Sequence, residues 1–152
     1  MKIAETLRLL LSPRQRLLDG LAAIAEDNEA LAANLSRHAE MCTFPTLRAS
    51  LEQVAAAETA QAGAMRDLLL QNGVLPRLPG RPLHEGSSNW ERLRNDLVLQ
   101  VKILRALHTQ LAEWTSIDQQ LAERLRALAA QQDRWVEQLR DVTLKCDPQA
   151  LD

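Results

Sequence analysis

Residues 51–65 read LEQVAAAETAQAGAM, and this stretch indicates how the chain folds. Its large apolar residues, Leu51, Val54 and Met65, recur at a spacing that places them on one face of an α-helix. Glu58 and Gln61 fall on the same face, although a core would bury that face. The stretch therefore predicts a buried helix whose apolar stripe is interrupted by polar residues.

Three further segments repeat this pattern, and together the four predict an all-α four-helix bundle. We expect long helices over residues 13 to 38 or 41, 45–72, 88–114 and 116–146. The residues that interrupt the other three stripes are Asn28, Gln100 and Gln132. The expected stripe of the third helix is Leu93, Leu97, Gln100, Leu104, Leu107 and Leu111, and that of the fourth is Leu121, Leu125, Leu128, Gln132, Trp135, Leu139 and Val142.

The expected helix boundaries rest on capping residues. Three serines are each followed three residues later by Gln or Glu, which is the capping-box pattern: Ser12 with Gln15, Ser88 with Glu91, and Ser116 with Gln119. Gly73 is expected as the left-handed residue that ends the second helix. Residues 73–88 are rich in Pro and Gly and predict a long linker without regular structure.

Composition limits the class of protein. The 152 residues suit one domain, expected over residues 13–146, with a short amphipathic helix within residues 1–12 and a tail at 147–152. The net charge of −2, with both signs mixed, argues against a nucleic-acid partner. No run approaches the roughly 20 apolar residues of a membrane span, and no signal-peptide pattern is present, so we expect a cytoplasmic protein.

The polar residues are expected to meet at one level of the bundle. Asn28 and Glu58 are equally distant from residue 43, which lies in the first helix–helix connection. Gln100 and Gln132 are equally distant from Ser116, which lies in the third. In an antiparallel pair of helices, equal distance from the turn means equal height, so all four helices should contribute to one polar layer.

This arrangement resembles the ferritin-like di-iron carboxylate family over about residues 13–146. That family has one Glu on each of the first and third helices and Glu-x-x-His on each of the second and fourth. The matching motifs here read ETAQ at 58–61 and QDRW at 132–135. Asn28 and Gln100 best match the other two positions, although Ala25 fits the usual family spacing slightly better. The resemblance implies a ferritin-like topology, in which the linker crosses the full length of the bundle.

The departures from the family pattern remove the chemistry of the metal site. Only Glu58 keeps a ligand type, and one carboxylate cannot offset the charge of two iron ions. Trp135 is expected to fill the space of a ligand and metal. We therefore expect no metal, no cofactor and no catalytic residue. The degenerate metal-site layer is expected to comprise Asn28, Glu58, Gln61, Gln100, Gln132 and Trp135.

Three functions remain open. The first is a non-catalytic bundle that acts through self-association, as a homodimer, or by binding a helical protein. The apolar residues Ile3, Leu7 and Leu10 would then form a dimer contact, or instead cap their own bundle. The second is a metal-handling or redox protein with an unconventional carboxylate site drawn from Glu26, Glu29, Asp96 or Asp133. The third is a helical adaptor or secretion chaperone.

Cysteine and histidine residues add two expectations. Cys42 and Cys146 are expected as free thiols in a reducing cytosol, and a crossing linker would place them at the same end of the bundle. Whether they pair is left open. His38 lies near the end of its helix, where a positive charge favours the helix dipole, and His108 borders the third stripe.

Overall fold

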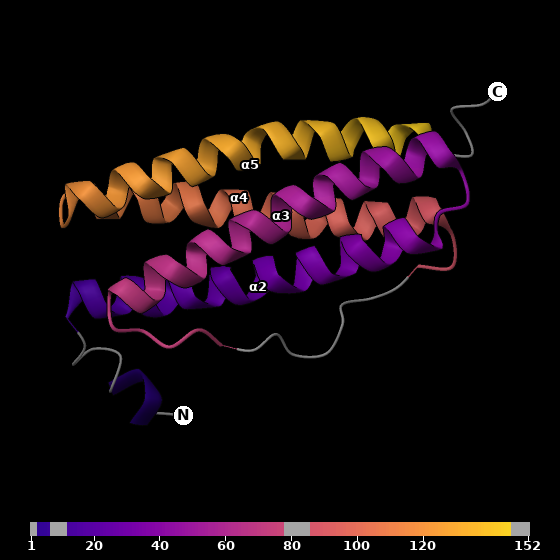
Figure 1. The fold of residues 1–152 in the computed structure, drawn as a ribbon. Helices are drawn as coiled ribbons and strands as arrows, with labels where there is room; N and C mark the ends of the chain where they lie inside the picture. Colours follow the sequence, from indigo (N-terminus) through magenta and orange to yellow (C-terminus); the bar gives the residue numbers. More distant parts are fainter. Residues whose placement is uncertain (1–2, 7–11, 78–85, 147–152) are drawn as a thin grey trace.

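The computed structural model describes residues 3–6, 12–77 and 86–146, and all regular structure within these ranges is helical. Four long helices are present: α2 (Pro13–Met41), α3 (Pro45–Gln71), α4 (Asn89–Trp114) and α5 (Gln119–Lys145) (Figure 1). A short helical stretch covers residues 3–6. The predicted all-α fold is confirmed. None of the helices in the described ranges is both long enough and apolar enough to cross a membrane.

Capping contacts confirm the predicted start of α2 and the predicted end of α3. The Ser12 hydroxyl accepts a hydrogen bond from the backbone N–H of Gln15 at 3.2 Å, and the Gln15 side chain accepts one from Ser12 N at 3.4 Å. Gly73 has a φ of 76° after the end of α3, and Val74 N donates to the Leu69 carbonyl at 2.9 Å. Glycine adopts this left-handed conformation without a steric penalty from Cβ.

The predicted start of α5 at Ser116 is wrong. Asp118 is the N-cap residue, and its carboxylate accepts a hydrogen bond from Leu121 N at 3.1 Å. Ser116 lies in the preceding turn, where its hydroxyl donates to the Glu113 carbonyl at 3.0 Å. A carboxylate at the first turn of a helix is favoured by the helix dipole, which explains why Asp118 takes the cap.

The end of α3 and the start of α4 lie at opposite ends of the bundle. At one end, Arg14 of α2 donates to Asn72, which follows α3, and to Asp118, which precedes α5. At the other end, Phe44, Asn89 and Cys146 lie around one hollow. Helices α3 and α4 therefore begin at the same end and run parallel, while α2 and α5 run the opposite way (Figure 1).

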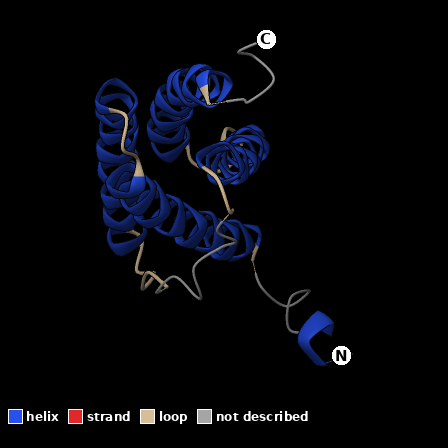
Figure 2. Ribbon diagram, turned by 90° about the vertical axis from the view of Figure 1, so that its right-hand side faces the viewer, coloured by secondary structure: helices blue, strands red, loops and turns tan. Residues whose placement is uncertain are grey.

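This topology is the crossover arrangement that the ferritin-like resemblance implies. Helix α2 packs against α3 and α4, and α5 packs against the same two helices. Figure 2, viewed roughly along the bundle, shows the four helices around a common centre. The prediction that Cys42 and Cys146 share one end is also confirmed, because Cys42 follows α2 and Cys146 follows α5. Both cysteines are free.

In α2 the apolar stripe that Asn28 interrupts, Leu17, Leu21, Ile24, Leu31 and Leu35, is buried as expected, but the buried face of α4 is rotated relative to its predicted stripe. Leu97, Leu104 and Leu111 are only half-buried. The interior positions belong instead to Asp96, Leu99, Ile103, Gln110 and Trp114, together with the predicted Leu93, Gln100 and Leu107. The predicted stripe of α4 was centred on leucines. In the structure, Asp96 and Gln110 lie inside because they find hydrogen-bond partners there.

The buried face of α5 also differs from the prediction at two positions. Leu128 and Trp135 are half-buried and pack against the edge of the core. Ala129 and Val136, one residue further along, are buried instead. Trp135 therefore lies at the edge of the core and, contrary to the expectation from the sequence, does not fill the space of a ligand and metal.

Candidate functional site

A single buried carboxylate lies at the centre of the predicted polar layer. Glu58 of α3 has no solvent-exposed surface. Its Oε1 accepts a hydrogen bond from Gln100 Nε2 of α4 at 2.7 Å, and its Oε2 accepts one from Asn28 Nδ2 of α2 at 2.7 Å. Gln132 of α5, also fully buried, lies beside the carboxyl group without a well-formed hydrogen bond to it. All four helices thus meet around Glu58.

Burial dominates the electrostatics of this layer. Loss of solvent raises the pKa of the Glu58 carboxyl group above its ordinary value, and the amides of Gln100, Asn28 and Gln132 oppose the rise. Three neutral amides do not replace the hydration of a charged carboxylate as a cation would. The neutral form of Glu58 is therefore favoured relative to a carboxyl group in water.

Gln61 and Trp135 lie outside the hydrogen-bonded part of the layer. Gln61 is buried three residues after Glu58, and its Nε2 has no hydrogen-bond partner within the described part of the chain. Trp135 lies at the edge of α5, as described above. The structure therefore brings together Asn28, Glu58, Gln100 and Gln132.

This layer does not fit a di-metal centre. The amide nitrogens of Asn28 and Gln100 are directed at Glu58. Both carboxylate oxygens that a metal would require therefore already accept hydrogen bonds. The layer offers one carboxylate and no imidazole, whereas two hard cations need several anionic ligands. Across residues 3–6, 12–77 and 86–146, no group of three or more His, Cys, Asp or Glu residues is arranged to hold a metal ion.

Three of the four carboxylates considered for an unconventional metal site have other partners. Glu29 pairs with Arg66 across α2 and α3. Asp133 lies 3.6 Å from the exposed His108, and Glu26 is half-buried on α2. The fourth candidate, Asp96, forms the ion pair described next. These residues do not converge on one site.

A second buried polar cluster was not predicted from the sequence. His38 Nδ1 of α2 and Asp96 Oδ2 of α4 form a hydrogen-bonded ion pair, and both side chains are almost completely buried. Burial raises the pKa of Asp96, while His38, Arg37 and Asn34 act in the opposite direction. His38 therefore has a specific partner in the core, and its role is not limited to the helix dipole.

A third polar contact lies at the opposite end, where α2 and α4 approach closely. The Gln110 side chain donates from Nε2 to the Leu17 carbonyl at 2.9 Å and accepts at Oε1 from Trp114 Nε1 at 2.6 Å. Arg14 stacks over the Trp114 ring at 5.5 Å from its centroid. The sequence signal for both unpredicted clusters was the spacing of Asp96, Gln110 and Trp114 relative to Leu93 and Leu107, which places them on one helical face.

No protein-family model matches the chain, and no curated protein matches it in sequence. The ferritin-like resemblance consequently rests on helix order, the crossover and the positions of the ETAQ and QDRW motifs. A shared topology by itself does not carry a shared function.

Proposed function

We propose that this chain is a non-catalytic, ferritin-like helical-bundle protein of the cytoplasm that has lost the di-iron site and acts through self-association. The observation that supports it is the use of both Glu58 oxygens by amide N–H groups of Asn28 and Gln100. Such a layer fixes the relative height of helices, because each buried polar group must find its partner. It leaves the outer faces of the bundle as the surfaces for function.

The outer face of α2 and α3 offers the most suitable surface for association. Two adjoining hollows of about 580 and 270 Å³ lie along this face, and Ser36 and Thr59 line both. We call this surface the α2–α3 groove; its small side chains are Ala32, Ala33, Ser36, Ala39, Ala55, Ala56, Thr59, Ala60, Ala62 and Gly63. Small side chains allow another helix to approach closely.

The charges around the α2–α3 groove favour a second copy of the same chain as its occupant. Arg48 and Glu52 pair at 2.9 Å toward one end, and Arg66 pairs with Glu29 toward the other. Each end therefore carries both signs. A two-fold interface brings the same surface of both subunits together, and a surface of mixed charge can meet itself without net repulsion.

Sedimentation velocity over a range of concentrations tests this proposal. We expect a dimer for the wild-type chain and a monomer for Ser36→Arg and Ala56→Arg, which place charge in the groove. Ala112→Arg is a matched control, because Ala112 is exposed on α4, and it should remain dimeric. A wild-type monomer at all concentrations, or dimers in both groove variants, would contradict the proposal.

The N-terminal segment provides an alternative association surface. Ile3 is 77% exposed, so it does not cap the bundle, whereas Leu7 and Leu10 lie outside the described residues. If Ile3→Glu is monomeric while both groove variants are still dimeric, the dimer interface lies in the N-terminal segment and not in the groove. A monomer that binds an amphipathic helical peptide would favour the adaptor or chaperone hypothesis.

A further inference from the structure

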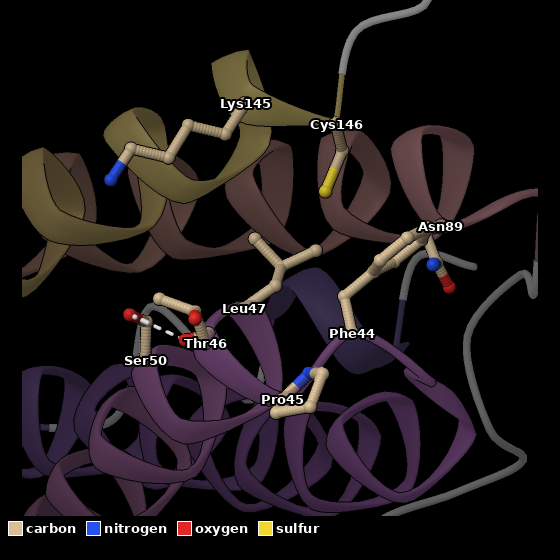
Figure 3. A pocket seen from close by; sticks show the side chains of 8 residues that line it. All are labelled: Phe44, Pro45, Thr46, Leu47, Ser50, Asn89, Lys145 and Cys146. Atoms are coloured by element: carbon tan, nitrogen blue, oxygen red, sulfur yellow. Dashed lines mark hydrogen bonds between the residues drawn. The ribbon is translucent and has the colours of Figure 1, made fainter.

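The two cysteines are placed at matching positions on two different helices. Cys42 is the C-cap residue of α2, and Cys146 is the C-cap residue of α5. Cys42 is buried, whereas Cys146 is half-buried and packs against the same hydrophobic core. Figure 3 shows the Cys146 sulfur directed from α5 toward Leu47 and Phe44, which belong to the segment directly after Cys42. Cys42 Sγ lies 3.9 Å from the Phe44 carbonyl oxygen, and Cys146 lines the same hollow as Phe44, so both cysteines lie beside one residue at this end of the bundle.

Electrostatics agree with this proximity. Burial raises the pKa of the Cys146 thiol, and the neighbouring Cys42 raises it further. Two thiolates repel one another, and this repulsion weakens as the distance between them grows. A raised pKa also reduces the thiolate fraction near neutral pH, so Cys146 should react slowly there and faster as pH rises.

The open hollow beside Cys146 gives an oxidant access to one of the two sulfurs. It has a volume of about 480 Å³ and is lined by apolar side chains of Phe44, Pro45 and Leu47, with Cys146 and Asn89 at its side (Figure 3). The buried Cys42 lacks comparable exposure. An external reagent should therefore meet Cys146 first.

We propose that Cys42 and Cys146 form an intramolecular disulfide by exchange with a small-molecule disulfide of the glutathione type. Cys146 loses its proton to solvent, and its sulfur attacks one sulfur of the oxidised reagent. The reagent's S–S bond breaks, one reduced thiol leaves, and a mixed disulfide remains on Cys146. Cys42 then loses its proton and attacks the Cys146 sulfur, which releases the second thiol. The two protein thiols give up two electrons, and the reagent's disulfide is reduced to two thiols.

The cross-link would join two helices that have little direct contact. Helices α2 and α5 stand at opposite corners of the bundle, because each packs chiefly against α3 and α4. The disulfide would close a loop of about 100 residues, which restricts the unfolded chain strongly. Oxidation should therefore raise the urea concentration at the midpoint of unfolding, and reduction should reverse the change.

Oxidation of the full-length chain by glutathione disulfide tests the proposal. The protein is alkylated after oxidation and digested with trypsin without reduction. Cleavage after Arg37, Arg48 and Lys145 should yield peptide 38–48 joined to peptide 146–152. Recovery of two separate glutathionylated or alkylated peptides would overturn the proposal. So would a cross-link between chains, which a mixture of isotope-labelled and unlabelled protein detects.

Two single variants test the order of the steps. Cys42→Ser should stop at the mixed disulfide and gain the mass of one glutathione on Cys146. Cys146→Ser should remain unmodified under the same native conditions, because Cys42 is buried. Equal rates of glutathione addition to the two variants would overturn the stepwise route. If either variant does not fold, the wild-type peptide map still decides whether the disulfide forms.

Discussion

His38 and Asp96 form an ion pair that joins α2 to α4 inside the bundle, with both side chains shielded from solvent. Arg37 and Asn34 also act on the Asp96 carboxyl group. A buried pair of this kind gains its Coulomb energy against a large loss of hydration. Removal of one member leaves the other in an environment that cannot hydrate it.

The first prediction concerns this pair. His38→Leu should lower the free energy of unfolding by about 3–5 kcal/mol, because the Asp96 carboxylate then loses its imidazole partner in the core. The double variant His38→Leu/Asp96→Val should recover most of the loss, since apolar side chains then replace both members of the pair. Urea denaturation of both single variants and the double variant measures the coupling.

The control for this cycle is Asp133→Asn in the exposed His108–Asp133 pair, whose atoms are 3.6 Å apart. An exposed pair contributes about 0–1 kcal/mol, so this variant should unfold nearly as the wild type does. Strictly additive effects of the His38 and Asp96 substitutions would show that the two side chains are not energetically coupled.

Sequence periodicity predicted the helices and the polar layer because these depend on local spacing, whereas the crossover was expected from the ferritin-like resemblance. Asn28, Glu58, Gln100 and Gln132 interrupt apolar stripes, and equal distances from the turns set their common height. Which face of α4 is buried could not be predicted in the same way. Counting leucines favoured the Leu97 face.

The true face of α4 depends on partners that are distant in sequence. Asp96 is stabilised inside by His38, and Gln110 by the Leu17 carbonyl. The spacing of Asp96 and Gln110 places them on one face of α4, but it does not show that His38 and the Leu17 carbonyl are available on α2 to stabilise that face inside the bundle. The start of α5 was missed for a related reason: both Ser116 and Asp118 are good N-cap residues, and Asp118 has in addition an ion pair with Arg14 at 3.0 Å.

The second prediction concerns two glycines in helices. A Cβ at residue 20 would lie 2.6 Å from Gln110 Nε2, which is held by its bond to the Leu17 carbonyl. Gly20→Ala should therefore break a buried hydrogen bond at a cost of about 1–3 kcal/mol, which exceeds the gain of about 1 kcal/mol in helix propensity. Thermal or urea unfolding should show a net loss of stability.

Gly63→Ala is the matched control, because a Cβ at residue 63 meets no atom within 4 Å. This variant should gain about 0.5–1 kcal/mol from helix propensity alone. Stabilisation by both substitutions would show that Gln110 moves without loss, and that its contact with Leu17 is not required.

The third prediction separates the two N-cap candidates of α5. Asp118→Ala removes the bond to Leu121 N and the pair with Arg14, so the midpoint of thermal unfolding should fall. Ser116→Ala should change it little. Arg14 and the backbone N–H of Leu121 lower the pKa of Asp118 in the folded chain. Its contribution to stability is therefore present above the ordinary pKa of an aspartate, and it is lost as pH falls through the lowered pKa of the folded state. A larger fall in the unfolding midpoint for Ser116→Ala than for Asp118→Ala would show that Ser116 is the N-cap residue, as the sequence predicted.

The last prediction concerns the pH dependence that Glu58 imposes on folding. Burial raises its pKa above the ordinary value of 4.5, so the folded chain keeps a proton that the unfolded chain releases. The unfolded state then binds fewer protons, and the free energy of unfolding falls as pH rises. The contribution is fully present below pH 4.5, is lost as pH rises through the folded-state pKa, and stays constant above it. Asp96, whose pKa is also raised above its ordinary value of 3.8, adds a loss of the same sign.

Glu58→Gln removes the ionisable group and keeps the shape. Its oxygen still accepts one N–H, and its NH2 group requires Asn28 or Gln100 to turn its own amide oxygen, which has no partner in the wild type, toward residue 58. At pH 8 the variant should be as stable as the wild type or more stable, because it has no charge that must be buried. Between pH 4.5 and 8 its stability should decline less than that of the wild type, with the share due to Asp96 remaining. Glu123→Gln, at an exposed position of α5, should reproduce the wild-type profile. A variant that loses several kcal/mol at pH 8 would show that the charged carboxylate itself is required, and with it a cation or ligand that the amides alone do not explain.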